Sequence, residues 1–188
     1  RISWAPEPLA RPPVLCAGCP HTSSFMAVRA SGARVAGDIG CYTLACLDPL
    51  RGIDTMVSMG SSIGNAIGMA MAGDTKPVMA TIGDSTFLHG GIPALIDAVY
   101  NQANITVLLL DNGNTAMTGR RDHPGTRNTP RRKDGPQLDY GALVRAGRGD
   151  GARSMDTHTP AQLSQPQSEG GAVTRTKDQP HHHARMGR

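Results

Sequence analysis

Two polar residues whose chemistry suits a divalent cation follow two apolar segments of the sequence. Asp84 comes after the run that ends at Ile82, within the stretch ATIGDSTFLHGGI, and Asn112 comes after the run that ends at Leu110. A carboxylate and an amide oxygen are hard ligands of the kind that Mg²⁺ prefers, and Mg²⁺ usually shares its coordination with phosphate oxygens. We therefore predict a Mg²⁺ site that binds a diphosphate, with the backbone carbonyl of Asn114 in the DNGNTAMTG turn as a third protein ligand.

A structural role is an alternative explanation for the same two residues. Aspartate is common where a helix begins and asparagine is common in turns, because their side-chain oxygens accept hydrogen bonds from nearby backbone N–H groups. The Gly83-Asp84-Ser85 triplet alone is therefore a weak signal, and the matching Asn112 one crossover later is what favours a metal site. The residue pattern by itself leaves both interpretations open.

Both residues need parallel strands to bring them to one edge of a sheet. The sequence predicts strands at four short apolar segments, namely residues 34–36, 55–58, 77–82 and 105–110. The last two are almost continuously apolar, which is typical of strands that are covered on both faces. We therefore predict an α/β fold in which a parallel sheet carries helices on both faces.

A helix is predicted between the last two of these strands. The apolar residues at helical spacing are Ile92, Leu95, Ile96, Val99 and Tyr100. Pro93 suits the first turn of this helix, where a backbone N–H has no partner within the helix. The strand–helix–strand unit makes its two strands parallel, and ligands of such sheets collect outside the carboxyl ends of the strands. Asp84 and Asn112 are therefore expected to share one crevice.

Glycines mark the start of another predicted helix. Gly60, Gly64 and Gly68 recur every four residues and form one bare stripe, which predicts close packing of another backbone. Gly60 and Ser61 stand at the start of this helix, where backbone N–H groups attract anions. We expect these two residues to face the diphosphate, and Gly64 and Gly68 to serve packing.

The composition excludes several classes of function. The 188-residue chain has a net charge of +4, but only 3% of its residues are aromatic, which is too few for the stacking platforms of nucleic-acid-binding proteins. No apolar segment reaches the length of a membrane span, and no secretory leader is recognisable. We expect a cytoplasmic location, and we expect the four cysteines to serve metal or redox chemistry rather than disulfides.

Several motifs in a fixed order point to a known family. They are CAGCPH at 16–21, GDIGCYTL at 37–44, GDS at 83–85, GIPALIDAVYNQANITVLLLDN at 91–112, TAMTG at 115–119 and HPGT at 123–126. The GDS and DNGNTAMTG motifs together resemble the thiamine diphosphate signature. The whole set, over residues 11–146, resembles the diphosphate-binding domain of the indolepyruvate ferredoxin oxidoreductase alpha subunit.

The resemblance implies a thiamine-diphosphate-binding fold and an oxidoreductase activity. Enzymes of this family decarboxylate an aryl 2-oxoacid oxidatively to an acyl-CoA and pass the electrons to ferredoxin. By position, Asp84, Asn112 and the carbonyl of Asn114 would hold the Mg²⁺ that anchors the cofactor. The residues expected to line the cofactor are Gly40, Cys41, Gly60, Ser61, Gly83, Ser85, Thr115, Ala116 and Met117.

Three interpretations remain open for Cys16, Cys19 and Cys41. The resemblance implies that they help to hold a [4Fe–4S] cluster, whose usual anchors are thiolates, but a fourth ligand expected from the C-terminal part is missing. The first alternative is a structural zinc that His21 also binds. The second is that these are plain thiols lining a cofactor pocket.

Other parts of the complete enzyme are expected outside this chain. The resemblance implies a pyrimidine-binding domain that carries the activating glutamate, a second (beta) subunit, ferredoxin and coenzyme A. The catalytic residue is therefore unknown, and the isolated chain is expected to be inactive. The alternatives are a non-redox thiamine diphosphate lyase or synthase domain, and an inactive truncated binding module.

The sequence divides into three parts. Residues 1–13 are rich in proline and are expected to be a linker from a missing upstream domain. Residues 14–146 are expected to form the thiamine-diphosphate-binding domain, with a short helix at 138–146. Residues 147–188 show almost no apolar periodicity, so a disordered or aberrant tail is expected, as a slipped reading frame would produce.

Overall fold

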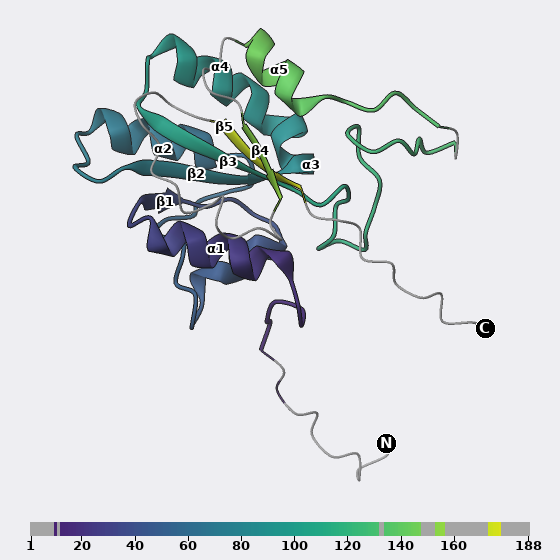
Figure 1. Cartoon of the computed structure of the whole chain (residues 1–188), viewed down its shortest axis with the longest axis horizontal. Helices are drawn as coiled ribbons and strands as arrows, with labels where there is room; N and C mark the ends of the chain where they lie inside the picture. Colours follow the sequence, from purple (N-terminus) through teal and green to yellow (C-terminus); the bar gives the residue numbers. More distant parts are fainter. Residues whose placement is uncertain (1–9, 11, 132–133, 148–152, 157–172, 178–188) are drawn as a thin grey trace, which may run out of the picture.

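The computed structural model of the chain describes residues 10, 12–131, 134–147, 153–156 and 173–177. Five parallel strands form one sheet in the order β1-β2-β3-β5-β4 (Figure 1). The strands are β1 (Arg34–Ala36), β2 (Val78–Gly83), β3 (Ile105–Asp111), β4 (Arg153–Asp156) and β5 (Val173–Lys177). Because the strands are parallel, β1, β2 and β3 all end at the same edge of the sheet.

Helices cover both faces of this sheet (Figure 1). On one face lie α2 (Ser62–Met71), α4 (Ile92–Tyr100) and α5 (Tyr140–Ala146), and on the other lie α1 (Pro20–Ala30) and the 3₁₀ helix η1 (Cys41–Cys46). The short helix α3 (Asp84–Thr86) and the π-helix η2 (Phe87–Gly91) connect β2 to α4. The predicted α/β fold with helices on both faces of a parallel sheet is confirmed.

The apolar run of β3 fills two separate cores. Ile105, Val107 and Leu109 belong to the core under α2, α4 and α5, whereas Leu108 and Leu110 belong to the core under α1 and η1. Successive side chains of a strand point to opposite faces of the sheet. A strand that is covered on both faces therefore consists mainly of apolar residues, and the charged Asp111 stands at the carboxyl end of β3.

The predicted strand–helix–strand unit is confirmed. β2 and β3 lie within one residue of the segments predicted at 77–82 and 105–110, and they pair in parallel. Helix α4 begins at Ile92 with a proline in its first turn. Leu95 is buried in the core, whereas Ile96 and Tyr100 are exposed. The apolar face of the helix is thus narrower than its sequence suggests.

The prediction of a strand at residues 55–58 is wrong. Thr55 makes a single parallel bridge to Ala36, and no strand forms there. The chain then turns sharply, because the Ser61 N–H donates to the carbonyl of Ser58 just before α2 begins. A segment that must turn into a helix so soon after its first bridge cannot continue along the sheet.

The glycine stripe of α2 does not serve packing within the described part of the chain. Gly64 and Gly68 are exposed, and no atom lies within 4 Å of the place where a Cβ would stand on either residue. No described backbone of this chain packs on them, so packing against another chain stays a prediction. The apolar contacts of α2 come instead from Ile63, Ala66 and Ile67, which are buried.

Two strands lie in the region for which no regular structure was expected. β5 pairs with β3, and β4 pairs with β5, so both extend the parallel sheet. Their sequences, RSMD and VTRTK, lack the apolar runs of β2 and β3, which explains why the pattern did not predict them. Residues 157–172 and 178–188 lie outside the described residues.

No described helix is both long and apolar enough to cross a membrane.

Candidate functional site

Asp84 and Asn112 lie at neighbouring strand ends, as the sequence predicts. Gly83 at the end of β2 is in register with Leu110 near the end of β3. The chain turns directly after both strands, and the Gly113 N–H donates a hydrogen bond of 2.8 Å to Asp84 Oδ2. The two segments are thus in direct contact at the carboxyl edge of the sheet.

Asp84 is a buried carboxylate, with 3% of its surface exposed. Its Oδ1 accepts a hydrogen bond from the Ser85 N–H at 2.7 Å, and its Oδ2 accepts the one from Gly113. The Nε2 atom of His123 lies 3.2 Å from the same Oδ2. Within the described part of the chain, no lysine or arginine forms an ion pair with Asp84. Its negative charge therefore remains available to a cation.

The turn at residues 112–114 offers further oxygen atoms. The Asn114 N–H donates to Asn112 Oδ1 at 3.1 Å, and Gly113 between them has a φ of 66°, in the region that favours glycine. Asn114 Oδ1 is buried and has no hydrogen-bond partner among the described residues. A buried acceptor without a donor is costly, and a bound cation would satisfy it. The residues present therefore fit a hard divalent cation.

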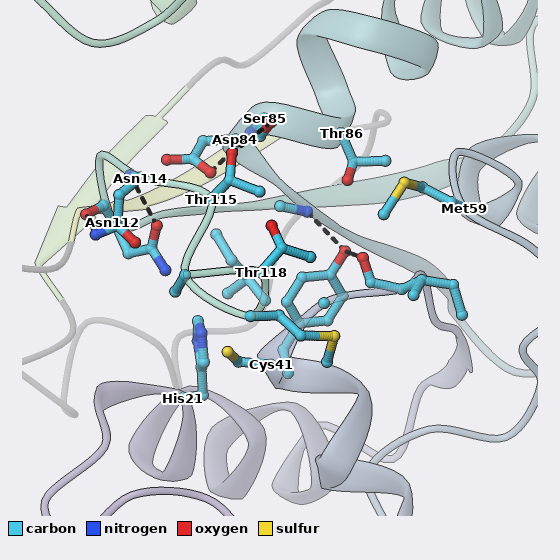
Figure 2. Close-up of a pocket in the computed structure, with 17 residues that line it drawn as sticks. His21, Cys41, Met59, Asp84, Ser85, Thr86, Asn112, Asn114, Thr115 and Thr118 are labelled. Carbon is cyan, nitrogen blue, oxygen red and sulfur yellow. Dashed lines mark hydrogen bonds between the residues drawn. The ribbon is translucent and has the colours of Figure 1, made fainter. Parts of the chain in front are cut away.

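A pocket of about 490 Å³, part of it open to solvent, lies beside these residues (Figure 2). Every predicted cofactor residue except Gly60 and Ser61 lines it. The lining residues for which no cofactor role was predicted are His21, Ile39, Tyr42, Met59, Thr86, Leu110 and Thr118. The CAGCPH and GDIGCYTL motifs contain His21, Ile39 and Tyr42. The motifs therefore indicated that these segments are important, but they did not predict that these side chains line the pocket.

The backbone N–H groups of Gly60 and Ser61 are already engaged. The Gly60 N–H donates to Asp38 Oδ1 at 2.7 Å, and the Ser61 N–H donates to the carbonyl of Ser58. Asp38 is fully buried and also accepts hydrogen bonds from the N–H groups of Ile39 and Ser62. This carboxylate, rather than a diphosphate, therefore caps the start of α2 in the structure.

Tyr42 braces the wall of the pocket. Its hydroxyl accepts a hydrogen bond of 3.0 Å from the Gly83 N–H and lies 3.3 Å from the carbonyl of Ile39, to which it donates. Burial raises the pKa of Tyr42, so the hydroxyl keeps the proton that it donates. The ring also explains two glycines, because a Cβ on Gly40 or Gly83 would be too close to it.

His21 contributes a buried imidazole to the pocket. It is 4% exposed, its ring contacts Tyr42 edge to face at 5.9 Å between centroids, and its Nδ1 has no hydrogen-bond partner in the described residues. Burial lowers the pKa of His21 to about 4, although the charge of Asp84 acts in the opposite direction. The imidazole is therefore neutral at neutral pH.

None of the four cysteines forms a disulfide in the structure, and their side chains do not converge on one point. Cys41 lines the pocket, whereas Cys16 is exposed, and Cys19 closes a turn by donating its N–H to the Cys16 carbonyl. Burial raises the pKa of Cys41, and the nearby Cys16 adds to this effect. Among the residues that the structure describes, no three Cys, His, Asp or Glu side chains form a metal-binding group. The zinc set with His21 is therefore not assembled, and the iron–sulfur cluster stays a prediction.

Comparison with known proteins adds independent information to this geometry. Residues 38–173 match the family described as thiamine pyrophosphate enzyme, C-terminal TPP binding domain. A protein of Archaeoglobus fulgidus named indolepyruvate oxidoreductase subunit IorA is 52% identical over 121 residues, which cover 62% of this chain and 19% of that protein. Its namesake from Methanothermobacter thermautotrophicus is 40% identical over 167 residues, which cover 84% of this chain and 26% of that protein. The chain thus spans about a fifth to a quarter of such relatives.

Solved structures show the same fold at low sequence identity. The 2-oxoglutarate:ferredoxin oxidoreductase of Magnetococcus marinus superposes with a TM-score of 0.76 at 19% identity, over 89% of this chain and 64% of that one. A putative thiamin diphosphate-dependent enzyme of Mycobacterium smegmatis gives a TM-score of 0.56 at 20% identity, over 93% of this chain and 35% of that one. At this identity the superpositions establish the fold.

Proposed function

The chain belongs to the thiamine pyrophosphate enzyme family, of which it carries the C-terminal TPP-binding domain, and on that premise we propose a more specific function. It is the diphosphate-binding half of an indolepyruvate-type 2-oxoacid:ferredoxin oxidoreductase. The complete enzyme decarboxylates an aryl 2-oxoacid oxidatively to an acyl-CoA and passes the electrons to ferredoxin. The names of relatives that are 40–52% identical support this choice of substrate class.

One observation carries the proposal, namely that the buried Asp84 carboxylate beside the turn at 112–114 pairs with no lysine or arginine among the described residues. In the proposed site the Asp84 carboxylate, the Asn112 side-chain oxygen and the Asn114 carbonyl hold Mg²⁺. Each oxygen of a carboxylate or amide has two acceptor positions, so the hydrogen bonds already present leave room for a metal. The buried side-chain Oδ1 of Asn114, which has no hydrogen-bond partner among the described residues, is a further oxygen near these ligands that a cation could satisfy.

The residues of the pocket divide the remaining tasks. When bound, thiamine diphosphate supplies the electron sink that the decarboxylation of a 2-oxoacid needs. Ile39, Met59, Leu110 and Met117 line the pocket with apolar surface. The neutral His21 places an uncharged hydrogen-bonding ring in the same pocket.

Electron transfer and activation require further components. We propose a [4Fe–4S] cluster with ligands from Cys16, Cys19 and Cys41 and a fourth ligand from elsewhere. The sequence resemblance alone supports it, because these thiols form no metal-binding group among the described residues. The activating glutamate belongs to a pyrimidine-binding domain outside this chain, and a beta subunit, coenzyme A and ferredoxin complete the cytoplasmic enzyme. The visible spectrum of anaerobically reconstituted protein tests the cluster, because a bound cluster absorbs broadly and zinc or free thiols do not.

The Mg²⁺ site is tested by replacing the charge of Asp84 while keeping its shape. Asp84→Asn should weaken Mg²⁺-dependent binding of thiamine diphosphate by more than ~100-fold, because the loss of a ligand exceeds the 10–100-fold that the loss of an outer partner usually costs. Calorimetry with and without Mg²⁺ measures this change. The control is Asp97→Asn, because Asp97 is exposed on α4. Equal binding by Asp84→Asn and the unmodified chain would contradict the proposed site.

A further inference from the structure

The HPGT motif places a histidine against the proposed metal ligand. His123 belongs to the irregular segment that follows the turn at 112–114, and its side chain is 2% exposed. Its Nε2 lies 3.2 Å from Asp84 Oδ2, on a carboxylate that two backbone N–H groups already hold. The sequence resemblance implies no role for this motif, and in the structure its histidine contacts Asp84 without lining the pocket.

The protonation of this imidazole follows from its second hydrogen bond. The Gly125 N–H donates to His123 Nδ1 at 3.1 Å, so Nδ1 acts as an acceptor and carries no proton. The proton of the neutral ring therefore lies on Nε2, and Nε2 donates to Asp84. The contact is thus a hydrogen bond from a neutral donor to a carboxylate, with its direction fixed by Gly125.

A neutral donor has a consequence that a cationic one would not have. Lysine or arginine at this place would cancel much of the charge of Asp84, and a divalent cation would then gain less from binding. A neutral imidazole orients the carboxylate and leaves its charge in place. Together with the N–H groups of Ser85 and Gly113, it fixes both oxygens of Asp84 before any metal arrives.

The segment that carries His123 is itself held firmly. The N–H and the hydroxyl of Thr126 both donate to the His123 carbonyl, at 2.9 Å each. Gly125 has no space for a Cβ, which would meet the hydroxyl of Tyr140 in α5 and come within 2.9 Å of the His123 ring. The histidine, glycine and threonine of HPGT are thus all used to place one imidazole.

We propose that His123 is a positioning residue that orients Asp84 for a divalent cation and thereby sets the affinity of the site for Mg²⁺. The proposal rests on the proposed function, because it assumes that Asp84 is a metal ligand. Outer partners that orient metal ligands typically change metal affinity 10–100-fold when they are removed. His123 acts through Asp84 and need not touch the cofactor.

Two amide substitutions separate orientation from simple packing. In His123→Gln the amide N–H reaches the place of Nε2 and keeps the donor to Asp84, whereas in His123→Asn it ends near the place of Nδ1 and does not. Calorimetry of the full chain then measures the Mg²⁺ concentration needed for thiamine diphosphate binding. We expect His123→Asn to weaken Mg²⁺-dependent binding 10–100-fold, and His123→Gln to restore most of it. Circular dichroism and thermal unfolding verify the fold of each variant.

The control is His89→Asn, because His89 is exposed on η2 and does not line the pocket. The inference is overturned if folded His123→Asn binds like the unmodified chain, or if the two amide variants bind equally weakly. It also fails if both variants unfold, since His123 would then serve the fold rather than the metal. Failure of the unmodified chain to bind Mg²⁺ and thiamine diphosphate would instead contradict the proposed function on which the inference rests.

Discussion

At the scale of single residues, the buried His21 links the stability of the fold to pH. Burial lowers the pKa of His21 from its ordinary value of 6.5 to about 4. Below about pH 6.5 the His21 imidazole of the unfolded chain therefore binds a proton, whereas that of the folded chain stays neutral down to about pH 4. The stabilising contribution is fully present above pH 6.5 and is lost as the pH falls toward 4.

This dependence predicts a difference between the unmodified chain and a variant without the imidazole. Between about pH 7.5 and pH 4.5, the free energy of unfolding of the unmodified chain should fall by roughly 2.5 kcal/mol more than that of His21→Gln. Urea unfolding at a series of pH values measures both. His89→Gln serves as the control, because His89 is exposed. Parallel pH curves for the unmodified chain and His21→Gln would refute the explanation.

Sequence reasoning found some residues of the site and missed others for a physical reason. Asp84 and Asn112 were predictable because each follows its own apolar run, and the crossover rule brings the two runs together. The contacts of Asp38, Tyr42 and His123 join residues that are 22, 41 and 39 positions apart. No local pattern encodes such distances, so the motifs marked these segments without revealing what their side chains contact.

At the scale of secondary-structure elements, two glycines in helical segments have opposite surroundings. Gly64 in α2 is exposed, and no atom of the described residues lies within 4 Å of the point that a Cβ would occupy there. Gly91 in η2 is buried, and a Cβ there would lie 2.8 Å from Phe87 and 3.0 Å from Ile82. Alanine should therefore have opposite effects at the two positions.

We expect Gly64→Ala to raise the free energy of unfolding by ~0.5–1 kcal/mol, because alanine loses less backbone entropy in a helix than glycine does. Gly91→Ala should lower it by ~1–3 kcal/mol through overpacking. Chemical denaturation of both variants measures the two effects. A stabilising Gly91→Ala would show that η2 can move away from β2 at little cost.

The elements that the sequence predicted correctly are those whose buried faces or end caps give a clear residue pattern. β2 and β3 are covered on both faces and show continuous apolar runs, and the short helix at the end of the LDYGALVRA stretch begins at Tyr140 with an Asp139 cap. The segment at 55–58 has apolar residues but forms only one bridge. An apolar run indicates that a segment is largely buried. It does not indicate that a neighbouring strand pairs with the segment along its whole length.

At the scale of the whole molecule, the chain corresponds to only part of the length of its curated relatives. It spans about a fifth to a quarter of relatives such as those from Archaeoglobus and Methanothermobacter. The purified chain should therefore show no ferredoxin reduction with indolepyruvate and coenzyme A, because the activating glutamate lies elsewhere in the proposed enzyme. Turnover should appear when the pyrimidine-binding part and the beta subunit are added. Activity of the isolated chain would contradict the assignment of a half-site.

The overall topology was predictable only as far as the apolar pattern extends. The sequence predicted a parallel α/β sheet without a strand order, and β1, β2 and β3 pair in parallel as neighbours. The addition of β5 and β4 at the other edge was not foreseen, because their residues are mostly polar and alternate weakly. Of these two strands only β4 is an edge strand, because β5 pairs with both β3 and β4.

Asp38 shows how closely two distant stretches of this domain depend on each other. Its side chain binds the N–H of Gly60 and that of Ser62, and its own neighbour Ile39 borders the pocket. An engineer who transplants the GDIG corner into another scaffold must therefore move residues 58–62 with it. If the corner were transferred alone, the buried Asp38 carboxylate would lose the N–H donors of Gly60 and Ser62. The recipient protein would then have to supply other hydrogen-bond donors.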